Sequence, residues 1–154
     1  MFVKEKSIHV DATPEVVFDY VSDILRHPEW AKHKLTIRTT PGGRYESTAQ
    51  VVPGHLEPRT AIRIETKERP HRFTYVCDDG FVGQYRWHFQ ITAAGSGSTI
   101  KYGVERLQAP LWVKLVQPWV LWPIDGRAGV LTGLANIKRA VEAGTQPSTA
   151  TDVG

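Results

Sequence analysis

Strict alternation between residues 84 and 91 is the feature that most constrains how this chain can fold. One side of an extended strand with this period carries large apolar side chains, namely Tyr85, Trp87, Phe89 and Ile91. The other side carries only polar and charged side chains, namely Gln84, Arg86, His88 and Gln90. A strand of this kind is half-buried, so another element must cover its aromatic face.

Neighbouring segments extend this strand into a sheet. Six segments separated by turns rich in Gly, Pro and Asp are predicted strands, at residues 35–40, 45–52, 60–68, 72–77, 84–92 and 99–107. A further strand is predicted at residues 2–11. The strands beside 84–92 continue its apolar face through Phe73, Tyr75 and Cys77 on one side and Ile100, Tyr102 and Val104 on the other. The sequence therefore predicts an antiparallel meander with one aromatic face.

Helices are predicted at both ends of this meander. Thr13 suits an N-cap and Pro14 a first helical position, and a second short piece anchored by Trp30 follows. A long helix is predicted from Gly126 to Ala143, with one apolar face made of Val130, Leu134, Ile137 and Val141. We expect one α+β domain over residues 1–143, with this helix covering the sheet, and a flexible polar tail over 144–154.

The segment SIHVDATPEVVFDYVSDILRHPEWA (7–31) and the order of elements over about residues 2–143 resemble the START-like/Bet v 1-like superfamily. Within it the chain is most similar to the bacterial polyketide cyclase/dehydrase and lipid-transport group. The resemblance implies the helix-grip fold, in which a curved seven-stranded antiparallel sheet wraps around a long C-terminal helix. It also implies a cavity for an apolar small molecule between them. The segment PGGRYE (41–46) lacks the longer glycine-rich loop of the plant allergen branch, so plant hormone binding is not implied.

Candidate ligand-binding residues lie on the aromatic face and on the elements that would cover it. They are Tyr75, Tyr85, Trp87, Phe89, Tyr102, Trp119, Trp122, Gly126, Val130 and Leu134. Plain core packing is the alternative for the aromatic side chains. Buried tyrosine hydroxyls need partners, however, and glycines inside a helix cost about 1 kcal/mol each relative to alanine. Both features favour a cavity.

The segment PLWVKLVQPWVLWPIDGRAG (110–129) concentrates three of the five tryptophans. Lys114 and two prolines interrupt it, so we expect no transmembrane span. At about 100° per residue, Trp112, Trp119 and Trp122 fall within an arc of about 80°. We therefore predict that the segment is the front half of the covering element, with Trp119 and Trp122 gating the pocket. Peripheral membrane contact and a homodimer interface stay open as alternatives.

Other sites and partners find little support in the sequence. A single cysteine, Cys77, predicts no disulfide framework and a reducing, cytoplasmic location, and no signal peptide is visible. The net charge of +3 is scattered, so no nucleic-acid partner is expected. The histidines lack metal-ligand spacing, no catalytic motif is present, and we expect neither metal nor cofactor. Asp78-Asp79-Gly80 is typical of a turn.

Three functions are consistent with these observations. The leading hypothesis is a non-catalytic carrier or sensor for a lipid, a sterol-like or a polyketide-like compound. The alternatives are a cyclase/dehydrase-type enzyme that uses the same cavity, and an interaction protein that uses residues 110–124. A closed, wholly apolar cavity would favour the carrier. An inward acid or base with a shifted pKa beside a tyrosine would favour the enzyme, and exposed tryptophans would favour the interface.

Overall fold

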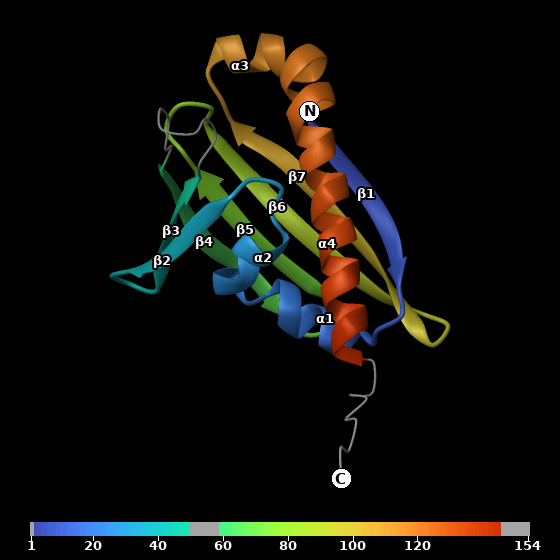
Figure 1. The fold of residues 1–154 in the computed structure, drawn as a ribbon. Coiled ribbons are helices and arrows are strands. Elements are labelled where there is room, and N and C mark those ends of the chain that lie inside the picture. Colours follow the sequence, from blue (N-terminus) through green and yellow to red (C-terminus); the bar gives the residue numbers. More distant parts are fainter. Residues whose placement is uncertain (1, 50–58, 146–154) are drawn as a thin grey trace.

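The computed structural model describes residues 2–49 and 59–145, and its largest element is a curved antiparallel sheet (Figure 1). The strands are β1 (Val3–Val10), β2 (Leu35–Thr40), β3 (Arg44–Ala49), β4 (Arg59–Glu68), β5 (Arg72–Asp78), β6 (Gln84–Ala94) and β7 (Gly97–Gln108). Their order across the sheet is β1-β7-β6-β5-β4-β3-β2. Only the return of β1 to pair with β7 departs from a simple meander.

The helices lie on the concave side of the sheet and at one end of it (Figure 1). They are α1 (Pro14–Val21), η1 (Ile24–Arg26), α2 (His27–Trp30), α3 (Leu111–Val116), η2 (Gln117–Gly126) and α4 (Arg127–Thr145). The long α4 crosses the concave face, α1 and α2 pack near its C-terminal half, and α3 and η2 connect it to β7. This arrangement confirms the predicted helix-grip fold with seven strands, a long C-terminal helix and short helices after the first strand.

Local sequence explains where α1 begins. The hydroxyl of Thr13 accepts a hydrogen bond from the backbone N–H of Val16 at 3.4 Å, and Pro14 occupies the first turn. Both features stabilise a helix N-terminus, as the sequence predicts. Val17, Phe18 and Val21 are buried, so this short helix is held by its contacts with the sheet and α4.

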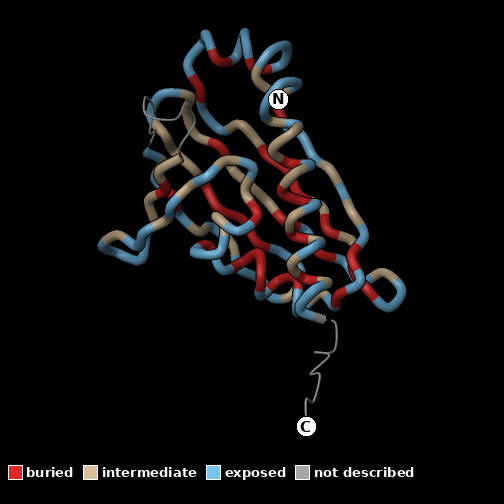
Figure 2. The backbone as a smooth tube through the Cα atoms, in the orientation of Figure 1, coloured by how far each residue is buried: buried red, intermediate tan, exposed pale blue. Residues whose placement is uncertain are grey.

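The core lies between α4 and the aromatic face of the sheet (Figure 2). The predicted apolar face of α4 is buried throughout, at Val130, Leu134, Ile137 and Val141. On the sheet, the ring of Phe89 stacks on Tyr102 with centroids 4.3 Å apart. The indole of Trp30 meets both rings edge-on at 5.7 Å. Stacked and edge-on contacts are the preferred geometries of aromatic pairs, so α2 is fixed to the sheet through Trp30.

The tryptophan-rich segment differs from its prediction. It does not continue the face of α4 but forms α3 and the wide π-type turns of η2, which contain Pro118 and Pro123. Proline lacks a backbone N–H, and the wider turns change the angular phase along the helix. Trp122 consequently points inward, whereas Trp119 is 82% exposed. The predicted position of Trp119 over the pocket is therefore wrong.

Two predicted features extend beyond the described part of the chain. The predicted strand 45–52 is seen as far as Ala49, and its last residues lie outside the described ranges. The predicted tail lies outside them from residue 146 onward. Within the described ranges, no helix has the length and apolar character needed to cross a bilayer.

Replacing Phe89 by alanine tests the aromatic core. Phe89 is fully buried, so F89A should lower the free energy of unfolding by about 3–5 kcal/mol in a urea titration. Phe81 is 71% exposed, and F81A is the matched control, expected to cost less than about 1 kcal/mol. Equal losses in the two variants would show that the stacked rings are not the core.

Candidate ligand-binding site

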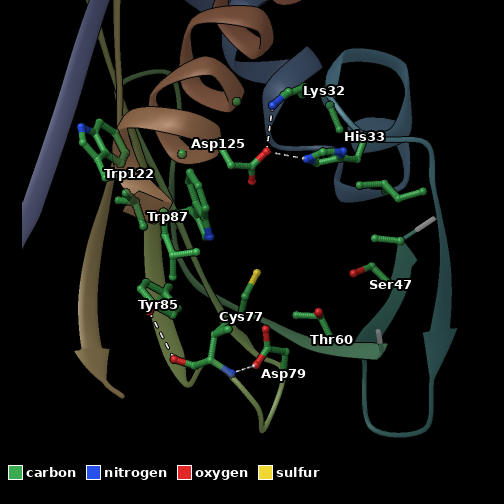
Figure 3. A pocket seen from close by; sticks show the side chains of 18 of the residues that line it. Lys32, His33, Ser47, Thr60, Cys77, Asp79, Tyr85, Trp87, Trp122 and Asp125 are labelled. Carbon is green, nitrogen blue, oxygen red and sulfur yellow. Dashed lines mark hydrogen bonds and ion pairs between the residues drawn. The ribbon is translucent and has the colours of Figure 1, made fainter. Parts of the chain in front are cut away.

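A cavity of about 430 Å³ lies between the sheet and the front of the C-terminal helix (Figure 3). Its walls come from strands β2 to β7, from the turn between β5 and β6, from α2 and the loop after it, and from η2 and the first turn of α4. Figure 3 shows Cys77 and Ser47 pointing into it from the sheet, opposite Asp125. Its volume falls within the range of about 300–1,000 Å³ that is typical of small-molecule pockets.

The predicted binding residues divide into three groups. Five line the cavity, namely Tyr85, Trp87, Tyr102, Trp122 and Gly126. Four are buried in the adjoining core and do not line it, namely Tyr75, Phe89, Val130 and Leu134. Trp119 points to solvent. The aromatic face of the sheet thus serves partly as core and partly as cavity wall.

Glycines along the covering helix create the space. A Cβ atom added to Gly129 would meet no atom within 4 Å, so this position opens onto the cavity that it lines. A Cβ atom on Gly126 would lie 2.7 Å from the Trp122 ring, and one on Gly133 would lie 3.4 Å from the Trp30 ring. Gly126 therefore leaves room for the Trp122 indole and Gly129 for the cavity, whereas a Cβ atom at Gly133 would make an ordinary contact with Trp30.

A chain of hydrogen bonds fixes η2 over one end of the cavity. Arg106 Nη1 donates to Gln117 Oε1 at 2.9 Å, and Gln117 Nε2 donates to the Tyr85 hydroxyl at 3.2 Å. That hydroxyl donates in turn to the carbonyl oxygen of Val82 at 3.2 Å. Gln117 is buried, so its amide is held between β7 and β6. With η2 held in this way, Trp122 stands at the end of the cavity.

The charged side chains at the rim pair with one another. Asp125 Oδ1 accepts hydrogen bonds from Lys32 Nζ at 2.8 Å and from His33 Nε2 at 3.0 Å (Figure 3). Burial alone would raise the pKa of Asp125, but these hydrogen bonds outweigh burial and lower it. These hydrogen bonds join Asp125 on η2 to the loop after α2. They connect the two sides of the cavity and pair the carboxylate of Asp125 with the ammonium group of Lys32.

Two further polar residues of the cavity wall are Asp79, which is held by hydrogen bonds within its own turn, and Cys77, whose thiol is unreactive. Asp79 Oδ1 accepts hydrogen bonds from the backbone N–H groups of Phe81 and Val82, at 2.9 and 2.6 Å, which is the predicted turn chemistry. Burial raises the pKa of the Cys77 thiol to about 12, and the nearby Asp79 contributes to this rise. Cys77 therefore stays protonated at neutral pH and is a poor nucleophile.

The inner wall contains a histidine that sequence reasoning missed. His27 opens α2 and lines the cavity, where its ring stacks on Trp30 with centroids 4.1 Å apart. Its edge meets Tyr75 at 5.8 Å. Burial lowers the pKa of His27 to about 4, so the imidazole is neutral at pH 7. No short motif marks this position, because its environment depends on strands far away in the sequence.

No metal-binding arrangement is found within residues 2–49 and 59–145. There, no group of three or more His, Cys, Asp or Glu side chains is placed to hold a metal ion. The described residues present aromatic rings, neutral hydrogen-bonding groups and paired charges to the cavity.

Comparisons with known proteins agree with this architecture. Residues 1–142 match the family described as polyketide cyclase/dehydrase and lipid transport. Among the curated proteins, none matches the sequence significantly.

Several solved structures share the fold. A conserved protein from Geobacillus kaustophilus has a TM-score of 0.73 at 11% identity, with 92% of this chain and 96% of that chain covered. A protein from Thermus thermophilus has a TM-score of 0.70 at 18% identity, covering 94% and 100%. Truncated norcoclaurine synthase from Thalictrum flavum has a TM-score of 0.64 at 20% identity, covering 91% and 92%. At these identities the likeness establishes the fold alone.

The lowered pKa of His27 makes stability dependent on pH. Between about pH 6.5 and pH 4 the unfolded chain binds a proton at this residue and the folded chain does not. Acidification through this window should therefore destabilise the wild type by about 3 kcal/mol more than His27→Phe, which lacks the titrating group. Urea titrations at a series of pH values measure the difference. Parallel pH profiles would contradict the buried, neutral imidazole.

Proposed function

Because the chain belongs to the polyketide cyclase/dehydrase and lipid transport family, we propose that it binds and carries an apolar small molecule in the cavity between the sheet and α4. A lipid, a sterol-like or a polyketide-like compound is the class of ligand that we expect. The observation that carries the proposal is the cavity, whose walls are mostly aromatic and aliphatic and whose space is kept by Gly126 and Gly129. Glycines inside a helix lower its stability, so keeping this space open has a cost. A ligand that occupies the space would explain why the cost is accepted.

Catalysis in the same cavity has one observation in its favour, namely His27 beside Tyr75. A neutral imidazole next to a tyrosine is the arrangement that a cyclase/dehydrase-type reaction would use. A pKa of about 4, however, makes His27 a weak base near neutral pH. The Cys77 thiol also stays protonated. These values favour binding over turnover as the proposed function.

Filling the cavity from the helix tests the binding function. Gly129→Leu places a branched side chain in the open space of the cavity, and leucine is a better helix former than glycine. We expect it to lower the affinity for the neutral fluorescent probe N-phenyl-1-naphthylamine by about tenfold or more without lowering the melting temperature.

The matched control for this variant is Gly144→Leu. Gly144 is exposed near the end of α4, and a Cβ atom there also meets nothing within 4 Å. This variant should bind the probe as the wild type does. Unchanged probe binding in Gly129→Leu would contradict a ligand site in the cavity.

We propose a second function for the outer side of α3 and η2, namely docking on a lipid surface. The surface, here called the α3–η2 patch, consists of Leu111, Trp112, Leu115, Trp119 and Ile124, all of which are exposed. Large exposed apolar patches mark interaction sites, and tryptophan favours the membrane interface. The only charged residue between positions 109 and 124 is Lys114, which suits anionic headgroups.

The position of the patch favours a lipid surface over a second subunit. η2 carries Trp119 and Ile124 on its outer side and Leu121 and Trp122 on the side that lines the cavity. One segment thus separates the cavity from the outer surface. An apolar ligand that enters past η2 would pass from a bilayer into the cavity without crossing bulk water. Such a path avoids exposing the apolar surface of the ligand to water, which is unfavourable.

Vesicle binding tests the α3–η2 patch. The wild type should co-sediment with vesicles of phosphatidylcholine and phosphatidylglycerol, and the double variant W119S/I124S should bind about tenfold more weakly or less. Leu131→Ser, at a half-exposed position on α4 outside the patch, is the control and should bind as the wild type does. A wild type that ignores vesicles but forms a dimer disrupted by W119S/I124S would assign the patch to a second subunit instead.

A further inference from the structure

Buried polar atoms without partners gather beside the cavity. Within the described ranges, four buried side-chain atoms lack a hydrogen-bond partner, namely His27 Nδ1, Trp30 Nε1, Thr74 Oγ1 and Tyr75 OH. Two of the four, His27 Nδ1 and Trp30 Nε1, belong to stacked rings that both line the cavity, with centroids 4.1 Å apart. The ring of Tyr75 lies behind them, 5.8 Å from His27, and its hydroxyl is close to that of Tyr102. Buried polar groups are almost always paired, so a cluster of unpaired ones indicates a missing partner.

The rings of this cluster are fixed in place. The indole of Trp30 is held edge-on against Phe89 and Tyr102, and His27 stacks on its face. His27 has no hydrogen bond from either ring nitrogen to a described residue. Trp30 is almost completely buried, whereas His27 is partly buried. Both rings line the cavity, which is therefore the space from which a partner can come.

The part of the wall formed by His27 and Trp30 carries no charge, and Asp79, which lines the cavity at the β5–β6 turn, accepts hydrogen bonds from backbone N–H groups there. The hydroxyls of Tyr75 and Tyr102 have pKa values raised by burial, and the Cys77 thiol beside them is protonated. The charged side chains Lys32 and Asp125 pair with each other at the rim. A carboxylate or an ammonium group placed at the inner wall would find no opposite charge, which makes its burial costly.

We propose that His27 and Trp30 form a subsite for one uncharged hydrogen-bonding group of the ligand, such as a hydroxyl, a phenol or a ketone. A neutral imidazole offers one N–H donor and one acceptor nitrogen, and the indole N–H adds a donor. A hydroxyl can both donate to the imidazole and accept from it. The ligand class that follows is a neutral molecule, apolar over most of its surface, that carries a polar atom at the end bound next to α2. This inference rests on the proposed binding function, because the subsite is part of the same cavity.

Three probes of one shape test the subsite, namely naphthalene, 2-naphthol and 2-naphthoate. They present hydrogen, a neutral hydroxyl and a carboxylate at the same ring position. In isothermal titration calorimetry at pH 7, the wild type should bind 2-naphthol about tenfold more tightly than naphthalene, with 2-naphthoate weaker than 2-naphthol. His27→Phe keeps a stackable ring without nitrogens, so it should bind naphthalene and lose most of the preference for 2-naphthol. His9→Phe, at an exposed position on β1 that does not line the cavity, is the control and should keep that preference.

NMR of the wild type gives a second measurement that needs no variant. The ring nitrogen resonances of His27 should shift on addition of 2-naphthol and stay in place with naphthalene. Binding of naphthalene and 2-naphthol with equal affinity would overturn the subsite and leave the apolar cavity standing, as expected if an internal water already satisfies His27. A preference for 2-naphthol that persists in His27→Phe, or tightest binding of 2-naphthoate, would also overturn it. Failure of all three probes to bind the wild type would overturn the binding function itself.

Discussion

The contact between α4 and the aromatic face of the sheet is close along one half of the helix and open along the other, and the cavity depends on this difference. Ile137 and Val141 are buried against the sheet and close the core at the C-terminal half of the helix. Toward the N-terminal end, Gly129 presents backbone to empty space. The same helix thus closes the core at one end and leaves a pocket at the other. The stability that its glycines cost is offset by the apolar area buried in its C-terminal half.

The fold could be predicted because its signals are local. Period-two alternation in β6 and the apolar face of α4 each depend on neighbouring residues along one element, and turn residues mark most of the strand ends. Prediction failed at Trp119, where helical phase was extrapolated through Pro118 and the π-type turns of η2. Backbone hydrogen bonding changes there, so Trp119 and Trp122, which an α-helical period places on one face, lie on opposite sides of η2.

The site was harder to predict than the fold because it depends on contacts between distant segments. The sequence correctly indicates an aromatic wall, and Tyr85, Trp87 and Tyr102 line the cavity. It does not indicate that Tyr75, two residues along the same face of β5 from Cys77, lies in the core behind that wall. Nor does it indicate His27, whose low pKa arises only when α2 is packed against the sheet.

The cavity joins an uncharged inner wall around His27 to a rim whose charges are compensated and to η2, whose outer side is apolar. Native mass spectrometry of the protein, purified without detergent from the organism that makes it, tests most directly whether a ligand occupies this cavity. The account predicts a non-covalent complex with a neutral, largely apolar molecule in the wild type, and its absence in Gly129→Leu purified in the same way. The same complex in both proteins, or the bare protein mass in both, would contradict it.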